Sequence, residues 1–147
     1  MIPIEIIAAG NIKKSSLLDI WEDYIRRIST SVTLYEIEET HKNKFEQKML
    51  QKVKSGAIII ALDERGKALS SMEIAKKFEN YAIESRKPIQ IFIGAADGLP
   101  SSIKEKADML LAFGKQTWPH KLIRIMLIEQ IYRAEKIIEG HPYHREG

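Results

Sequence analysis

Short apolar runs alternate with segments of helical periodicity along this 147-residue chain. The run AIIIAL at 57–62 is apolar at every position, and IQIFI at 89–93 is interrupted by one polar residue only. A strand that is apolar on both faces is typical of a parallel sheet covered by helices on both sides. The alternation therefore predicts an α/β fold, with a mostly parallel sheet and helices on both faces.

About five strands are expected from the apolar pattern. They should cover residues 2–8, 32–37, 57–62, 89–93 and 109–113. Helices should follow, with N-terminal caps at Ser15 or Ser16, at Ser70 with Glu73 and at Ser102 with Glu105, and a last helix from about Pro119 to Glu139 that stops at Gly140. The length is typical of one domain, so we expect residues 1–147 to form a single domain.

Composition excludes several function classes. The chain has no cysteine, which excludes disulfide frameworks, thiolate zinc sites, iron–sulfur clusters and catalysis by a thiolate. No apolar run approaches the roughly 18 residues that a membrane-spanning helix needs. The segment MIPIEIIAAG has no basic region and carries Glu5, unlike a secretory signal. We therefore expect a cytoplasmic protein with no membrane partner.

Lysines gather in one predicted helix. The net charge is +3, which permits a polyanionic partner without requiring one. The segment 42–54, however, carries five lysines against one acidic residue, Glu46. These lysines could bind RNA phosphates or could form an ordinary solvated face, and the sequence leaves both readings open.

Three loops are the candidate ligand site, because open α/β sheets bind ligands beyond the carboxyl ends of their strands. They cover 62–63, 94–98 and 113–120, and we expect them in one neighbourhood. The segment GAADG at 94–98 lacks the third glycine of a dinucleotide-binding motif. It is either a tight turn that needs a positive φ or a backbone cradle that lets a ligand approach closely.

The last predicted helix is apolar almost all round at 122–128. This pattern implies burial on more sides than one sheet provides, which suggests a partner subunit. Arg124, set in this stretch, could form a buried pair with Glu129 at a dimer seam or could contact an anion.

The segment after Gly140, HPYHREG at 141–147, combines two histidines, a tyrosine and an arginine. A tyrosine can stack on a base, an arginine can bind phosphate and a histidine can donate or accept a proton near neutral pH. A metal site shared with His120 is disfavoured because Pro142 breaks helical spacing, so we expect no metal.

Four segments together resemble the ribosomal RNA large subunit methyltransferase H family of the SPOUT superfamily. They are IGAADGL at 93–99, TWPH at 117–120, RIMLIEQIYRA at 124–134 and HPYHR at 141–145. The resemblance spans essentially the whole chain. It implies a C-terminal deep trefoil knot, a homodimer and S-adenosyl-L-methionine as cofactor. The implied activity is N3-methylation of a pseudouridine in a 23S rRNA hairpin loop near the decoding site, on the assembled ribosome.

The resemblance also implies site residues. Those implied to bind the cofactor are Leu62, Gly94, Phe113, Gly114, Lys115, Gln116, Thr117 and Trp118. Ala95 stands where family members usually have a second glycine. The tail of one subunit is implied to reach the cofactor of the other. We expect His144 to be the base, with Tyr143 and Arg145 holding the nucleotide.

Other function classes compete with this reading. A non-catalytic ribosome-binding or RNA-binding module would explain the basic helix and the tail, but it would not need a glycine-bounded pocket. A flavodoxin-like domain would require an acidic cluster after the first strand, and residues 8–11 contain no acidic residue. The lack of cysteine favours a nitrogen or oxygen acceptor, because methylation at a base carbon generally needs a thiolate to activate the ring.

Overall fold

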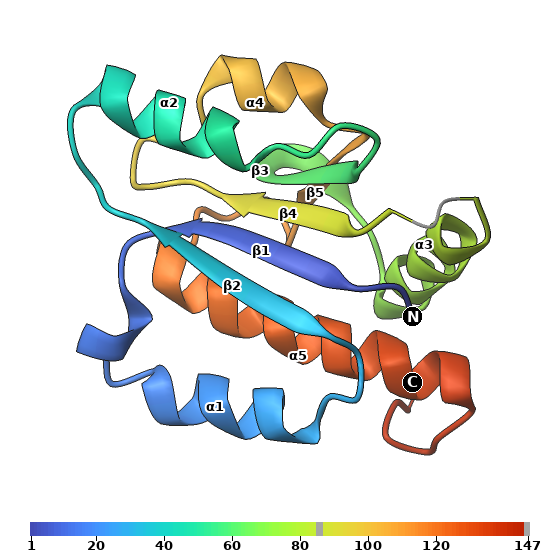
Figure 1. The fold of residues 1–147 in the computed structure, drawn as a ribbon. Coiled ribbons are helices and arrows are strands. Elements are labelled where there is room, and N and C mark those ends of the chain that lie inside the picture. The colour runs from blue at the N-terminus through green and yellow to red at the C-terminus, as the bar shows by residue number, and fades with distance from the viewer. Residues whose placement is uncertain (85–86, 146–147) are drawn as a thin grey trace.

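A five-stranded parallel sheet in the order β2-β1-β4-β3-β5 forms the centre of the computed structural model, which describes residues 1–84 and 87–145 (Figure 1). The strands are β1 (Ile4–Ala9), β2 (Val32–Ile37), β3 (Ile58–Ala68), β4 (Ile89–Ile93) and β5 (Met109–Ala112). The helices are η1 (Ile12–Lys14), α1 (Leu18–Arg27), α2 (Lys42–Lys52), α3 (Ser71–Glu84), α4 (Ser101–Lys106) and α5 (His120–Glu139).

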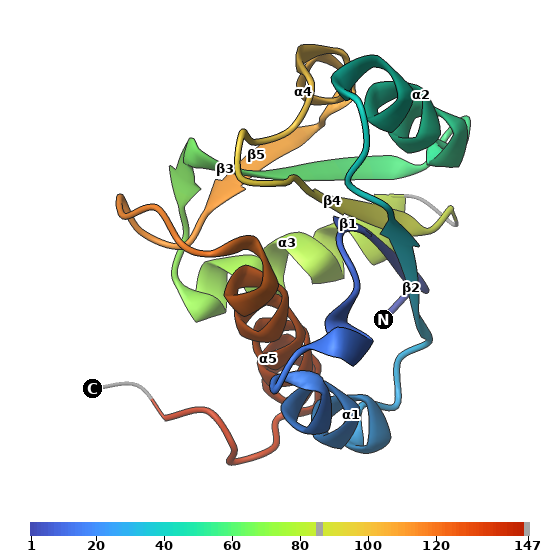
Figure 2. The same cartoon turned by 90° about the vertical axis from the view of Figure 1, so that its left-hand side faces the viewer.

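Helices cover both faces of the sheet. Figures 1 and 2 show α2 and α4 on one face and α1, α3 and α5 on the other. Successive strand residues point to opposite faces, so Phe92 belongs to the cluster containing Phe45, while Ile91 belongs to the cluster containing Phe78 and Ile128. The predicted α/β architecture is confirmed, and no helix among the described residues has the length and hydropathy needed to cross a membrane.

The two predicted capping boxes have different outcomes. The Ser70 backbone N–H donates to Glu73 and the Glu73 N–H donates to the Ser70 hydroxyl, at 2.9 and 3.1 Å, which confirms the first box. The second is wrong, because α4 begins directly after Pro100 and Ser102 lies inside its first turn. The Ser102 hydroxyl instead donates to Glu46 of α2 at 2.6 Å and links the two helices on that face.

The ends of other elements also differ from the pattern. The N-cap of α1 is Leu17, and the Ser15 hydroxyl accepts from the Leu17 N–H at 3.0 Å in the turn before it. Strand β3 continues through the charged segment 63–67, where its pairing with β5 shifts register between Leu62 and Lys67. Gly140 ends α5 in the left-handed conformation, with φ 75°, as predicted.

Helix α5 is covered mainly by its own chain. The sheet, α1 and α3 pack around it, and Leu127 and Ile128 are almost fully buried. Leu122, Ile123 and Met126 stay half-buried. The burial that the sequence implies for 122–128 is thus largely supplied by α1 and α3, and this helix alone does not require a partner subunit.

Of the two readings left open for Arg124, the pairing with Glu129 is wrong. Residues five apart lie on different sides of a helix, whereas residues four apart are neighbours. Glu129 accordingly pairs with Arg133, with 2.7 Å between carboxylate and guanidinium.

Arg124 reaches in another direction and joins α5 to the carboxyl ends of β1 and β2. Its side chain has no exposed surface, and its guanidinium donates to Glu36 at 2.7 Å and to the carbonyls of Ala9 and Gly10 at 2.7 and 3.2 Å. Burial lowers the pKa of Arg124, and the Glu36 carboxylate opposes that effect. The bonds hold the start of α5 against the sheet.

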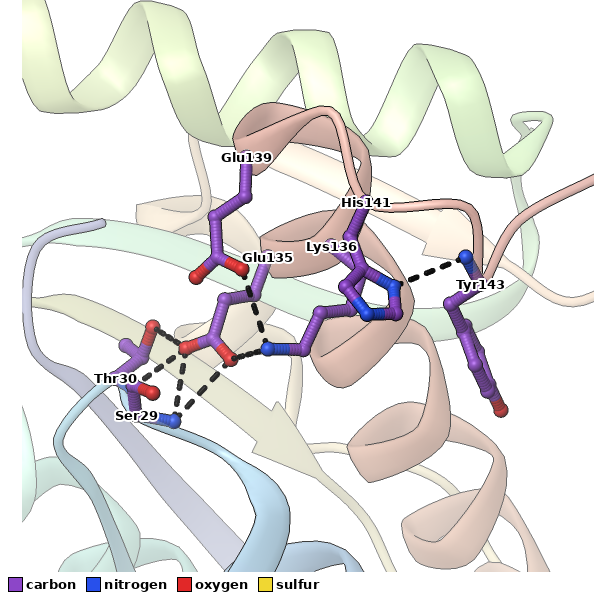
Figure 3. A network of polar contacts seen from close by, with 7 residues as sticks. All are labelled: Ser29, Thr30, Glu135, Lys136, Glu139, His141 and Tyr143. Atoms are coloured by element: carbon purple, nitrogen blue, oxygen red, sulfur yellow. Dashed lines mark hydrogen bonds and ion pairs between the residues drawn. The ribbon is translucent and has the colours of Figure 1, made fainter.

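Glu135 anchors the other half of α5 (Figure 3). Glu135 is 4% exposed, and its carboxylate accepts from the Ser29 N–H at 3.0 Å and from the N–H and hydroxyl of Thr30 at 2.6 Å each. Burial by itself would raise the pKa of Glu135, but these hydrogen bonds and nearby Lys136 hold it below its ordinary value. The ionised carboxylate therefore stabilises the turn between α1 and β2.

We predict that Glu135→Gln lowers the free energy of unfolding at pH 7 by about 1–3 kcal/mol, the usual loss for hydrogen bonds to a buried charged acceptor. Because the folded-state pKa is depressed, the carboxylate's contribution is lost as pH falls through that pKa. The difference between the variant and the parent should therefore shrink below about pH 4 in urea unfolding. Glu139→Gln, at an exposed carboxylate, is the control and should change little. A gap that stays constant with pH would contradict this prediction.

Candidate functional site

A cavity of about 680 Å³ opens at the carboxyl ends of β3, β4 and β5. Its lining comes from residues 62–65, 93–99, 111–113 and 116–120, together with Lys104 and Ile123. The expectation that the three loops lie in one neighbourhood is confirmed. The volume is that of a pocket for a small molecule or cofactor.

The turn at 94–98 closes on itself. A Cβ atom at Gly94 would lie 2.4 Å from the Gly98 carbonyl carbon, and Ala95 forms an isolated bridge with Gly98. Gly98, not Gly94, has the positive φ, at 85°. Gly94 is therefore required by the close approach of the chain's own backbone, and Gly98 supplies the positive φ of the predicted tight turn.

The loop that follows β5 is held by two side-chain bonds. The Trp118 indole N–H donates to the Phe113 carbonyl at 2.9 Å and closes the loop, although 38% of Trp118 is exposed. The Thr117 hydroxyl donates to Glu64 of β3. These bonds fix the loop as one wall of the cavity.

Charges in the cavity are weighted toward carboxylates. Asp63, Glu64 and Asp97 line it against the cations of Arg65 and Lys104. Asp63 lies 3.3 Å from the Lys104 ammonium. The Arg65 backbone N–H, and then Lys104, hold the pKa of Asp63 below its ordinary value, so this carboxylate is ionised at neutral pH.

His120 lies where the cavity meets the end of β1. Its Nε2 is 3.2 Å from Glu39, and its Nδ1 is buried with no hydrogen-bond partner in the structure. His141 and His144 follow the other end of the 20-residue helix α5, about 30 Å away at 1.5 Å per residue. These three histidines do not converge, and among residues 1–84 and 87–145 no three metal-ligating side chains gather.

Several residues singled out by the sequence lie outside this cavity. Gly114 lines a second groove, of about 510 Å³, between α1, α3 and α5. Lys115 is exposed and lines neither space. Arg145 is exposed, and Glu146 and Gly147 of the predicted tail lie outside the described residues.

The tail packs on the second half of α5, in a group we name the tail anchor: Glu129, Arg133, Tyr143 and His144. Arg133 donates to Glu129 at 2.9 Å, contacts the Tyr143 ring at 4.8 Å and lies 3.0 Å from His144 Nδ1. The Tyr143 hydroxyl donates to Glu129 at 3.2 Å. Burial first, and then the Glu129 charge, raise the pKa of Tyr143 to about 12, so its phenol stays protonated at neutral pH.

Comparison with known proteins agrees with this architecture. Residues 2–144 match a family model described as a predicted SPOUT methyltransferase. The chain belongs to the SPOUT methyltransferase family. It is 44% identical to the ribosomal RNA large subunit methyltransferase H of Zymomonas mobilis, over 98% of this chain and 99% of the relative. It is 42% identical to the protein of that name from Rhodospirillum centenum, over 94% of this chain and 95% of the relative.

Sequence reasoning located the loops of this SPOUT methyltransferase but missed side chains around them. Lys104 enters the cavity from α4, and no motif connects it with Asp63. Glu64 lies in a charged segment of β3, and nothing in the sequence indicates that it binds Thr117. The Glu129–Arg133 ion pair of the tail anchor could have been predicted from the sequence, because opposite charges four residues apart on a helix indicate an ion pair.

We predict that the same side chain has different effects at the two glycines of the 94–98 turn. Gly98→Asn should cost about 1 kcal/mol or less, because asparagine tolerates positive φ and a Cβ there meets nothing within 4 Å. Gly94→Asn should cost about 1–3 kcal/mol more, because its Cβ overlaps the Gly98 backbone. Urea unfolding of both variants of the SPOUT methyltransferase measures the difference, and equal losses would show that the close approach is not limiting.

Proposed function

We propose that this SPOUT methyltransferase transfers a methyl group from S-adenosyl-L-methionine to N3 of a pseudouridine in the 23S rRNA hairpin loop near the decoding site, on the assembled ribosome. The observation that carries the proposal is the nearly full-length likeness to proteins named ribosomal RNA large subunit methyltransferase H. That likeness spans the cavity loops and the tail anchor alike. The cytoplasm, where ribosomes are, is the proposed location.

The cavity suits this cofactor in size and charge. Leu62, Leu99 and Phe113 give it apolar surface for a base, and exposed polar groups of the 116–117 segment give it hydrogen-bonding capacity. Three carboxylates against two cations favour a ligand with a positive centre such as a sulfonium. We assign the cofactor to Leu62, Gly94, Phe113, Gln116, Thr117 and Trp118, with Gly114 and Lys115 completing the loop.

The residues of the chain would then align the cofactor with the base and exclude water from the site. They would form no covalent bond to the base. S-adenosyl-L-methionine, when bound, supplies an electrophilic methyl group on sulfur. The loop closed by Trp118 and Thr117 fixes one wall, and alignment in a closed site can supply much of the rate. Overall, the N3–carbon bond forms, the sulfur–carbon bond breaks and the N3 proton leaves. Tyr143, His144 and Arg145 are the residues we assign to the nucleotide.

A homodimer is part of the proposal, because cavity and tail do not meet in one chain. His120 at the cavity and Arg133 in the tail anchor are separated by about 20 Å of helix, at 1.5 Å per residue. The second groove is lined by Phe113 and Gly114 of the cofactor loop and by Glu129 of the anchor, beside Ile20, which is 46% exposed. A second copy seated there would bring a tail to a cavity across the interface.

Two fold-level expectations belong to the same proposal. Residues 1–147 form a single SPOUT domain, supported by one sheet that carries both apolar clusters. The trefoil knot is supported by the path of 113–119, which runs from the edge strand β5 to His120 beside Gly10 at the end of β1.

Mass mapping of 23S rRNA from a strain with and without this protein tests the activity directly. We expect one N3-methylpseudouridine to be missing from the deletion strain and to return with the gene. Calorimetric titration with S-adenosyl-L-methionine distinguishes the proposed methyltransferase from the alternative, a non-catalytic RNA-binding module. Such a module would leave the rRNA masses unchanged and bind no cofactor.

We predict that removing residues 143–147 leaves dimerisation and cofactor binding nearly unchanged but lowers methyl transfer to ribosomes by at least about 10²-fold. The deletion removes the His144 imidazole and the Tyr143 ring, two of the groups assigned to the nucleotide, which lie beyond the Gly140 helix end. Sedimentation, calorimetry and transfer of labelled methyl groups measure the three properties. An unchanged transfer rate would contradict the assignment of the tail to substrate.

Mixed dimers give the matched control. The truncated chain is combined with a chain that has an intact tail and a cavity disabled by Thr117→Val with Trp118→Ala. Part of the activity should return, because one of the two composite sites of the mixed dimer joins an intact tail to an intact cavity. If each inactive chain stays inactive in the mixture, the tail does not act across subunits.

We predict that lysines of α2 bind ribosomal RNA phosphates. Lys44 and Lys48 lie one turn apart, and among the described residues neither has an ion-pair partner. Lys44→Gln with Lys48→Gln should reduce the slope of log affinity against log salt by about one to two units for ribosome binding. The control pair, Lys76→Gln with Lys77→Gln, lies on α3 on the other face of the sheet and should leave the slope unchanged. Equal slopes for both double variants would show that α2 is only a solvated face.

A further inference from the structure

The tail anchor fixes which nitrogen of His144 carries a proton. A guanidinium has only donors, so at 3.0 Å the Nη1 group of Arg133 donates and His144 Nδ1 accepts. A neutral imidazole with an accepting Nδ1 carries its proton on Nε2. The ring thus presents an N–H group, and not a lone pair, at Nε2.

Arg133 is itself held firmly enough to impose this arrangement. Its Nε and Nη2 atoms donate to Glu129 at 2.9 and 2.7 Å, and Tyr143 covers one face of the guanidinium. The hydrogen bond to Glu129 raises the pKa of Arg133 above its ordinary value, so the group stays a donor at every pH of interest. Glu129 is in turn bound by the Gln130 amide at 2.8 Å.

We infer that Arg133 is a positioning residue, and that His144 donates a hydrogen bond from Nε2 to a carbonyl oxygen of the target base instead of accepting its N3 proton. The inference rests on the proposed function. In a uracil-like ring N3 lies between two carbonyl groups, and the negative charge left when N3 loses its proton spreads onto their oxygens. A donor aimed at such an oxygen stabilises the nucleophile. Because Nε2 already carries a proton, the N3 proton passes to solvent water.

The tautomer is tested by nitrogen NMR of the full-length dimer with ¹⁵N-labelled histidine. The four histidines are distinguished by the signals that His144→Gln removes. We expect His144 to be protonated at Nε2 in the parent and to hold this preference less strongly in Arg133→Met. Arg27→Met is the matched control, since Arg27 stacks on Tyr132 beside the tail but does not touch His144. A parent His144 protonated at Nδ1 overturns the inference, whatever the activity of the protein.

Substitution at His144 separates a donor from a base. The glutamine amide of His144→Gln places an N–H near the Nε2 position but has no basic nitrogen, whereas His144→Glu offers an acceptor and His144→Leu offers neither. We expect the glutamine variant to methylate ribosomes within about tenfold of the parent, and the other two to lose about 10²-fold or more, the usual effect of one donor to a developing oxyanion. Calorimetry should show cofactor binding unchanged in all three.

The outcomes are distinct. If His144→Glu is active while His144→Gln resembles His144→Leu, His144 is a base and the inference fails. If all three variants have equal activity, whether high or low, Nε2 donation is not what the reaction needs and the inference also fails. If the parent protein does not methylate ribosomes, the proposed function fails instead, and the NMR measurement still decides the tautomer.

Discussion

The buried guanidinium of Arg124 is the interaction on which the site geometry depends. It joins helix α5 to the carboxyl ends of β1 and β2 through Glu36 and two backbone carbonyls. With α5 fixed there, the loop after β5 must cross the ends of β3 and β4, and this crossing gives the cavity its wall. Losing one partner of a buried pair leaves an uncompensated charge, which typically costs about 3–5 kcal/mol. The same bonds thus support both the fold and the pocket.

Much of the fold follows from local signals. The apolar runs at 57–62 and 89–93 are central strands because they lie between two helical layers, and such burial leaves no polar alternation. The capping box of Ser70 and the end of α5 at Gly140 depend on hydrogen bonds between residues close in the sequence. Both can therefore be predicted from the sequence directly. The convergence of the three loops also follows, since the carboxyl ends of parallel strands share one edge.

What the sequence could not show depends on contacts between distant residues. Arg124 and Glu36 are separated by 88 positions, and charge spacing within α5 suggested the wrong partner. The role of Gly94 depends on where the Gly98 backbone returns, which composition does not reveal. The Ser102 capping box failed because α4 already begins after Pro100, which leaves Ser102 inside the first turn, where its hydroxyl donates to Glu46 on a neighbouring helix. The position of His144 depends on the direction that the tail takes after Gly140, and no periodicity in the sequence specifies that direction.

Helix α5 holds the cavity wall at one end and the tail anchor at the other. A helix is a rigid spacer in which each residue adds about 1.5 Å and a rotation of about 100°. One residue inserted between Arg124 and Glu129 would therefore swing the anchor to another side of the helix, while every hydrogen bond within each half stayed intact. Surface loops generally tolerate changes in length, whereas a change in the length of this stretch of α5 would move the tail anchor relative to the cavity.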